Sequence, residues 1–139
     1  MSLTVFRVRC AVVLGALVLA TAACGPSSSP APAAAPKPGG PTPEPTAVTL
    51  GQAVMVQKGC GGCHTIPGVP GATGSIGPNL DGVASRSAIA GGAVPNNGPD
   101  DLKRWILDPP AVKPGTQMPK LGLSDDEATQ VVAFLETLR

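Results

Sequence analysis

The sequence has few of the large side chains that usually fill a protein core. Its 139 residues include no tyrosine, one tryptophan, two phenylalanines and a single histidine. Charged residues make up only 14% of the chain, and the formal net charge is +1. A composition this close to neutral gives no indication of nucleic-acid binding.

Long hydrophobic runs are also missing, apart from a short one at the N-terminus. Arg7 and Arg9 precede an apolar run from Cys10 to Leu19, and small residues follow. This run is too short to span a bilayer comfortably. Its order of charged, apolar and small residues predicts a secretory signal over residues 1–23, the alternative being a retained single-pass anchor.

A cysteine follows this segment directly. The residues from Thr21 to Cys24 (TAAC) resemble the lipobox of bacterial lipoproteins, although Thr21 stands where leucine is most common. The resemblance implies that Cys24 is lipidated and anchors the exported protein to the outer face of the cytoplasmic membrane, since two or more acyl chains suffice for stable anchoring. The alternative is ordinary cleavage near Ala23 and a protein without a lipid.

Residues 25–48 consist almost entirely of Pro, Ala, Ser, Gly and Thr, with only Lys37 and Glu44 charged. This composition has no hydrophobic periodicity and predicts a semi-rigid linker with a stretched reach on the order of 70 Å. We therefore expect the lipidated cysteine and a linker over residues 24–48, followed by one globular domain over residues 49–139.

The domain is expected to begin with a helix. Thr49 and Gln52 form a Thr-x-x-Gln capping box, which predicts a helix that starts there and runs to about Gly59. Its apolar face would hold Leu50, Ala53, Val54 and Met55.

Two further helices are predicted nearer the C-terminus. Pro99 and the acidic residues after it indicate a helix over residues 100–108. Its buried stripe would be Leu102, Trp105 and Ile106, and Pro109-Pro110 would end it. Ser124 and Glu127 form a second capping box. The apolar residues that follow it at helical spacing are Ala128, Val131, Val132, Leu135 and Leu138.

Between residues 65 and 98 the chain is crowded with Gly, Pro, Asn and Ser, and no strand pattern survives. We expect loops there, with one short helix around residues 82–90. A domain of three short helices and long loops buries little core, and its aromatic residues are Trp105 and Phe134 alone. These features predict an all-α domain whose centre is filled by something other than side chains.

One motif indicates what fills the centre of the domain. Cys60-Gly61-Gly62-Cys63-His64 is the attachment motif of c-type haem. The two residues between the thiols match the separation of two porphyrin vinyl groups, and His64 is directed at the iron. A zinc site would need a second ligand pair, and a thioredoxin-like pair would need a βαβ context. We therefore predict one covalent haem c on Cys60 and Cys63, with His64 as an iron ligand.

Two methionines remain as candidates for the sixth ligand once the signal is removed. Met55 precedes Cys60 by five residues on a predicted helix, where it cannot reach the opposite haem face. Met118 lies in an extended loop flanked by prolines. We therefore interpret Met118 as the ligand and Met55 as core packing. Ligation by histidine and methionine raises the reduction potential.

Several separated motifs extend along the domain. They are the segments 58–66 (KGCGGCHTI), 77–80 (GPNL), 84–86 (ASR), Leu102, 104–106 (RWI), 108–109 (DP), 113–115 (KPG), 118–119 (MP) and 121–124 (LGLS). Together these segments resemble class I cytochromes c, and more narrowly the cytochrome c domain fused to subunit II of some bacterial haem–copper oxidases. No cupredoxin domain or copper-ligand cluster is recognised, which points to the cytochrome module alone on a lipid tether.

The resemblance implies a class I cytochrome c fold, with three to four short helices and long loops around one haem c and with the first and last helices crossing near their ends. It implies that the Pro78 carbonyl accepts the Nδ1–H of His64. It also implies that Trp105 donates to a haem propionate and that Arg86 offsets propionate charge. The alternatives are that Trp105 belongs only to the buried stripe and that Arg86 is a solvated loop residue.

Two strong iron ligands leave no open position for a substrate, which favours an electron carrier over an enzyme. The resemblance implies electron delivery to a membrane haem–copper terminal oxidase from an upstream quinol-oxidising complex or dehydrogenase. The alternatives are the electron-accepting subunit of an exported dehydrogenase or nitric oxide reductase, a gas-binding haem protein, and a structural haem subunit.

Docking to a redox partner is expected to depend weakly on charge. The full chain has ten basic and nine acidic side chains. Removal of the signal takes away Arg7 and Arg9, which leaves eight basic and nine acidic side chains and a net charge of −1. Long-range steering should then be modest. Lys58, Lys113 and Lys120 lie near the ligand-bearing segments and are candidates for a local basic rim.

Overall fold

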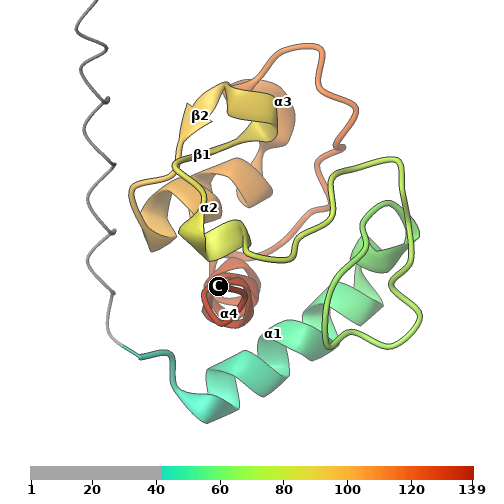
Figure 1. The fold of residues 1–139 in the computed structure, drawn as a ribbon, viewed down its shortest axis with the longest axis vertical. Helices are drawn as coiled ribbons and strands as arrows, with labels where there is room; N and C mark the ends of the chain where they lie inside the picture. The colour runs from blue at the N-terminus through green and yellow to red at the C-terminus, as the bar shows by residue number, and fades with distance from the viewer. Residues whose placement is uncertain (1–41) are drawn as a thin grey trace, which may run out of the picture. The chain divides into compact units, whose positions relative to one another are not determined.

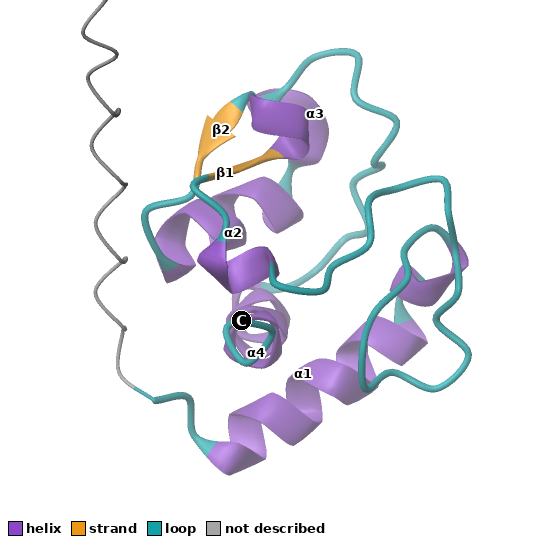
Figure 2. Ribbon diagram, viewed as in Figure 1, coloured by secondary structure: helices purple, strands orange, loops and turns teal. Residues whose placement is uncertain are grey.

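The structure is a computed structural model that describes residues 42–139. Cys24 and the other features predicted within residues 1–41 lie outside the described residues. The described part is mostly helical (Figures 1 and 2) and confirms the predicted all-α class, apart from one small sheet. With η marking a short 3-10 helix, the elements are α1 (Pro45–Gln57), η1 (Cys60–Gly62), η2 (Val83–Ser85), β1 (Ala88–Ile89), η3 (Ala90–Gly92), β2 (Val94–Pro95), α2 (Pro99–Leu107), α3 (Pro109–Val112) and α4 (Asp125–Leu135).

Helix α1 begins at Pro45 rather than at Thr49. Proline suits the first turn because its φ is already helical and its missing N–H would have no partner there. The predicted capping box is therefore wrong. The Thr49 hydroxyl donates to the Pro45 carbonyl one turn earlier, at 3.1 Å. The Gln52 side chain donates to the carbonyl of Gly68 and so joins α1 to the loop after the cysteine motif.

Helices α1 and α4 approach each other so closely that no side chain fits between them at one point. A Cβ added to Gly51 would lie 1.9 Å from the carbonyl oxygen of Gln130. Both residues lie near the middle of their helices, so the prediction that the helices cross near their ends is wrong. Figure 1 shows α1 running across the view while α4 is seen end-on.

This crossing also decides which face of α1 is buried. Gly51, Val54 and Met55 are buried, whereas Leu50 is 45% exposed and Ala53 is exposed as well. The predicted apolar face was therefore wrong for Leu50 and Ala53, because the contact with α4 centres on the smallest residue of the helix.

Helix α2 buries the predicted stripe of Leu102, Trp105 and Ile106. The two prolines after Asp108 end α2 as predicted, and they also begin α3, a short helix that was not predicted. The carboxylate of Asp108 caps α3 by accepting the N–H of Ala111 at 3.2 Å. Prolines at the first helical positions need no such acceptor.

Helix α4 begins with the predicted capping box. The hydroxyl of Ser124 accepts the N–H of Glu127 at 3.2 Å, and the Glu127 carboxylate accepts the N–H of Ser124 at 2.8 Å. Leu138 follows the end of the helix and is partly buried against the same core. The residues that α4 buries are Ala128, Val131, Val132, Phe134 and Leu135.

The segment between residues 65 and 98 contains more regular structure than predicted. Strands β1 and β2 pair in antiparallel fashion, with Ala88 opposite Pro95 and Ile89 opposite Val94. Strands of two residues are too short to show an alternating pattern, and the absence of strands was therefore wrongly predicted. The short helix expected around residues 82–90 is limited to η2.

Buried apolar residues from the helices and from this loop segment form one core cluster. The loop contributes Ile66, Val69, Val83, Ile89 and Val94. Among the helices within residues 42–139, none is both long enough and apolar enough to cross a bilayer.

Candidate functional site

The cysteine motif forms a compact turn directly after α1. The N–H groups of Cys63 and His64 both donate to the carbonyl of Cys60, at 3.2 and 3.0 Å. A following loop backs this turn, because the N–H of Gly77 donates to the Cys63 carbonyl at 2.8 Å and Thr65 forms an isolated bridge with Thr73. The turn thus presents both thiols and the imidazole to one cavity.

The His64 ring is held on two sides. Its Nδ1 lies 2.7 Å from the carbonyl oxygen of Pro78. A carbonyl only accepts, so Nδ1 carries the proton and Nε2 keeps a lone pair for a metal. A Cβ added to Gly77 would lie 2.3 Å from Cε1 of His64, so the ring packs directly against that backbone. The structure therefore contains the hydrogen bond that the resemblance implies.

The turn faces a cavity of about 430 Å³. This volume falls in the range of roughly 300–1,000 Å³ typical of ligand and cofactor sites. Apolar side chains from β1, α2 and α4 supply its walls, among them Ile89, Leu102, Ile106, Val131 and Leu135. The cavity brings together every predicted site residue of the described part, namely Cys60, Cys63, His64, Pro78, Arg86, Trp105 and Met118.

These groups fit a haem c. Cys60 and Cys63 are free thiols that both line the cavity, as covalent attachment requires. His64 has its Nε2 outside the bond to Pro78, and apolar walls suit the body of the macrocycle. Arg86 and the indole of Trp105 supply donors for carboxylates at the same cavity.

The other interpretations of the cysteine pair find no support. Burial raises the pKa of the Cys60 thiol and outweighs a backbone hydrogen bond that lowers it, and the neighbouring Cys63 adds a smaller upward contribution. A redox-active dithiol needs the opposite, a lowered thiol pKa. Over residues 42–139, no three side chains of His, Cys, Asp or Glu are grouped so that they could hold a metal ion. A zinc site therefore lacks its ligands in this part of the chain.

Both candidate methionines line the cavity. Met55 is 2% exposed and belongs to the core cluster on α1. Met118 is only partly buried, in the loop between α3 and α4, and its N–H donates to the Thr116 hydroxyl at 3.3 Å. Lining the cavity does not by itself choose between them, and the choice of Met118 stays a prediction.

The two predicted donors are placed differently. Trp105 is 9% exposed and serves both the buried stripe of α2 and the cavity wall. Arg86 also lines the cavity, but its Nη2 donates to the backbone carbonyls of Asn79 and Asp81, each at 2.6 Å. Arg86 is therefore a half-buried loop residue whose guanidinium is bound to two backbone carbonyls.

Each of the three lysines suggested for a basic rim has a partner, and Lys113, whose partner is an uncharged carbonyl, also lines the cavity. Lys58 pairs with Glu127 at 3.1 Å, and Lys120 pairs with Asp108 at 2.6 Å. Lys113 donates to the carbonyl of Ala90 at 2.9 Å. Their charges serve the contacts between helices and loops.

Two features of the site are not predicted by the sequence. Ile76 lines the cavity and is 70% exposed, the most exposed large apolar side chain of the described part. Asn96, which is 2% exposed, donates to the backbone of the segment that carries Arg86. No sequence pattern predicts that an isoleucine in a polar loop lines a cavity. None predicts that one asparagine of an Asn-Asn pair is buried and binds a neighbouring backbone.

Residues 48–139 match the family model described as cytochrome c. The chain is 31% identical over 98 residues to a cytochrome c oxidase subunit 2 of Alkalihalophilus pseudofirmus, an alignment that covers 70% of this chain. It is 33% identical over 105 residues to a cytochrome c homolog of Bradyrhizobium diazoefficiens, covering 63% of this chain. A third relative is the cytochrome c oxidase subunit 2 of Bacillus subtilis, 32% identical over 95 residues and 64% of this chain.

The alignments cover the relatives only in part. They span 27% and 26% of the two oxidase subunits and 56% of the cytochrome c homolog. The likeness therefore concerns one domain of the oxidase subunits and leaves the rest of those proteins unmatched.

Proposed function

Because the chain belongs to the cytochrome c family, we propose that it is a one-haem electron carrier, tethered to the outer face of the cytoplasmic membrane, that serves a haem–copper terminal oxidase. Family membership accounts for covalent haem c with its iron and for electron transfer. The haem iron supplies the one-electron chemistry when it is bound. The residues of this chain would hold the haem, set its potential and keep water away.

The single observation that supports this proposal best is the arrangement around His64. Its Nδ1 is held by the Pro78 carbonyl at 2.7 Å, and its ring shares a cavity with Cys60 and Cys63. The two thiols would form thioethers with the haem, and Nε2 of His64 would bind the iron. The bond to Pro78 fixes the tautomer and makes Nε2 a stronger donor.

Met118 is the proposed second axial ligand. It reaches the cavity from the loop between α3 and α4, far in sequence from the cysteine turn. Met55 sits on α1 directly before that turn and packs in the core. Thioether ligation stabilises ferrous iron and raises the potential. If Nε2 of His64 and the sulfur of Met118 both bound the iron, no place would remain for a substrate, which favours electron transfer over catalysis and over gas binding.

Trp105 and Arg86 are the proposed partners of the haem carboxylates. Both line the cavity, and both offer N–H donors. Trp105 would supply one neutral donor from α2. Arg86 would supply positive charge, beyond the two backbone carbonyls that it already holds.

The proposed electron acceptor is a membrane haem–copper oxidase, and the proposed donor is a quinol-oxidising complex or dehydrogenase. The support is the likeness to two proteins named cytochrome c oxidase subunit 2. Ile76, exposed at the cavity, would give a partner an apolar contact beside the haem. The alternative function is that of the electron-accepting cytochrome subunit of an exported dehydrogenase or nitric oxide reductase. That function would use the same haem site.

The proposed tether is a lipid on Cys24 followed by the proline- and alanine-rich linker. Because α1 starts at Pro45, the spacer would comprise residues 25–44. Tethering would raise the local concentration of the haem at a membrane-bound partner without fixing its orientation.

Fractionation and oxygen uptake of Cys24→Ser cells test this proposal, with Cys10→Ser, a change inside the predicted signal, as the control. We expect Cys24→Ser to release the protein with its haem spectrum intact and to slow respiration through the oxidase. A Cys24→Ser protein that stays in the membrane would refute lipid anchoring. A released protein with normal respiration at native abundance would refute tethering as the means of reaching the oxidase.

A further inference from the structure

The carbonyl that orients His64 belongs to an exposed segment. Pro78 and Asn79 are both exposed, so water competes for the Pro78 oxygen unless the neighbouring peptides are fixed. On the N-terminal side, the N–H of Gly77 donates to the Cys63 carbonyl at 2.8 Å. On the C-terminal side, the N–H of Leu80 donates to the Thr65 carbonyl at 2.9 Å.

Arg86 adds a charged contact on the C-terminal side. Its Nη2 donates to the carbonyls of Asn79 and Asp81, each at 2.6 Å. Hydrogen bonds from an ionised donor are roughly twice as strong as neutral ones. The N–H of Asp81 donates in turn to the Asn79 side chain at 2.9 Å. The guanidinium therefore closes the turn of residues 79–81 directly after Pro78.

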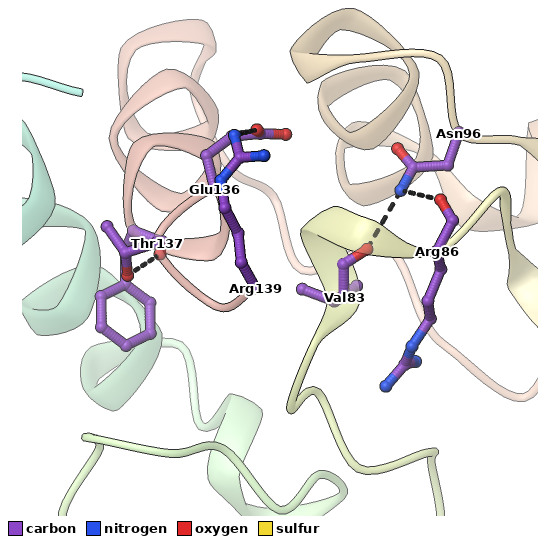
Figure 3. A network of polar contacts seen from close by, with 7 residues as sticks. Val83, Arg86, Asn96, Glu136, Thr137 and Arg139 are labelled. Atoms are coloured by element: carbon purple, nitrogen blue, oxygen red, sulfur yellow. Dashed lines mark hydrogen bonds and ion pairs between the residues drawn. The ribbon is translucent and has the colours of Figure 1, made fainter. Parts of the chain in front are cut away.

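Asn96 fixes Arg86 from the protein interior. Its Nδ2 donates to the carbonyl of Arg86 at 2.9 Å and to that of Val83 at 3.1 Å, and its N–H donates to the Ser87 carbonyl at 2.9 Å. Figure 3 shows the Arg86 side chain extending away from Asn96. The backbone of Arg86 is thus anchored by a residue that is 2% exposed, while its guanidinium reaches the outer loop.

We propose that Arg86 is a positioning residue for His64: by holding the carbonyls of Asn79 and Asp81, it keeps the Pro78 carbonyl on Nδ1. This inference rests on the proposed function, in which His64 binds the iron. A firmly held acceptor makes the imidazole a stronger donor, which stabilises ferric iron and lowers the potential. Arg86 would thereby act on the iron through the backbone, in addition to its charge.

The positioning effect and the charge effect have opposite signs. Removing a positive charge near the iron stabilises the ferric state and lowers the potential. Loosening the Pro78 acceptor weakens the histidine donor and raises the potential. Arg86→Lys keeps the charge, but the ammonium of lysine ends short of the position of Nη2, the one nitrogen that makes both bonds, so it isolates the positioning effect. Asn96→Ala keeps every charge and frees the Arg86 backbone.

The test uses the haem-loaded protein in its reduced form. Hydrogen exchange of the His64 Nδ1–H is followed by nuclear magnetic resonance, and the potential is measured by redox titration. Arg104→Lys is the matched control, because Arg104 is an exposed arginine on α2 paired with Asp101 at 3.0 Å. We expect roughly tenfold faster exchange in Arg86→Lys, a raised potential, and no change in Arg104→Lys.

Two results would overturn the inference while leaving His64 as the ligand. One is wild-type exchange in both Arg86→Lys and Asn96→Ala; the other is a lowered potential in Arg86→Lys. If the wild-type protein shows no histidine resonances shifted by the haem, the proposed function falls as well. That outcome is visible before any variant is compared.

Discussion

The imidazole of His64 occupies the space into which a side chain at residue 77 would have to project. A Cβ on Gly77 would lie 2.3 Å from Cε1 and 2.6 Å from Nδ1 of His64. The N–H of the same glycine donates to the Cys63 carbonyl at 2.8 Å. The backbone at residue 77 is therefore part of the wall that orients the proposed iron ligand.

Gly77→Ala should displace the His64 ring and weaken its bond to Pro78. We expect the haem to stay attached, the potential to rise, and the free energy of unfolding to fall by about 1–3 kcal/mol, as overpacking usually costs. Redox titration and denaturant unfolding check this. The control is Gly62→Ala in the same motif, where a Cβ would meet nothing within 4 Å. Equal potentials for the two variants would contradict the role of Gly77.

Gly51→Ala should open the crossing of α1 and α4, because the new Cβ would lie 1.9 Å from the Gln130 carbonyl oxygen. Both helices must shift, so we expect a loss of about 2 kcal/mol or more. That loss corresponds to a Tm lower by roughly 10 °C in a domain of this size. Val56→Ala, at a residue 56% exposed on the same helix, should leave Tm nearly unchanged. A Gly51→Ala protein that melts with the wild type would refute the crossing geometry.

Glu127 should make the stability of the domain depend on pH. Hydrogen bonds from the Ser124 N–H first, and then from Lys58, hold the pKa of the Glu127 carboxyl below its ordinary value of 4.5. A lowered folded-state pKa means that the stabilisation is present above 4.5 and is lost as the pH falls through the lower value. The difference in unfolding free energy between wild type and Glu127→Gln should therefore shrink with acidification.

Denaturant unfolding from neutral pH down to about 3 measures this difference. The control is Asp126→Asn, an exposed acid of the same first turn of α4, which should show a smaller dependence. A Glu127→Gln difference that is constant across this range would mean that the capping box and the Lys58 pair do not carry the effect.

Docking to the proposed oxidase partner should depend more on apolar contact than on charge. The candidate lysines are all engaged, and Ile76 is 70% exposed beside the cavity. Ile76→Ser should slow oxidation by oxidase-containing membranes, while Leu50→Ser, also at an exposed apolar residue, should not. Added salt should lower the rate only mildly. A steep salt dependence together with a normal rate for Ile76→Ser would contradict this.

The sequence predicted best those elements whose signals are local. The capping box of Ser124 and Glu127 fixes the start of α4 through two hydrogen bonds within one turn, and Pro99 begins α2 in the same local way. The Thr49 and Gln52 pattern gave the wrong start for α1, because the helix begins one turn earlier at Pro45. A capping pattern inside a helix looks the same in sequence as one at its end.

The contacts that position the site were harder to predict because most of them use the backbone. The cysteine motif and the resemblance pointed to His64 and Pro78, but Arg86 binds the carbonyls of Asn79 and Asp81. Every residue has a carbonyl, so such a contact leaves no trace in the side-chain pattern. The crossing at Gly51 could not be predicted for a related reason. A glycine has no apolar side chain, so a helix face centred on it does not stand out in the hydrophobic pattern.

Above all, we propose that His64 and Met118 bind the iron of a covalently attached haem. The most direct measurement is the weak charge-transfer band between methionine sulfur and ferric iron, recorded for wild type, Met118→Ala and Met55→Ala with the haem attached through both thioethers. We predict that the band is present in the wild type and in Met55→Ala, and that Met118→Ala loses it and has a lower potential. A band that persists in Met118→Ala and disappears in Met55→Ala would contradict the account.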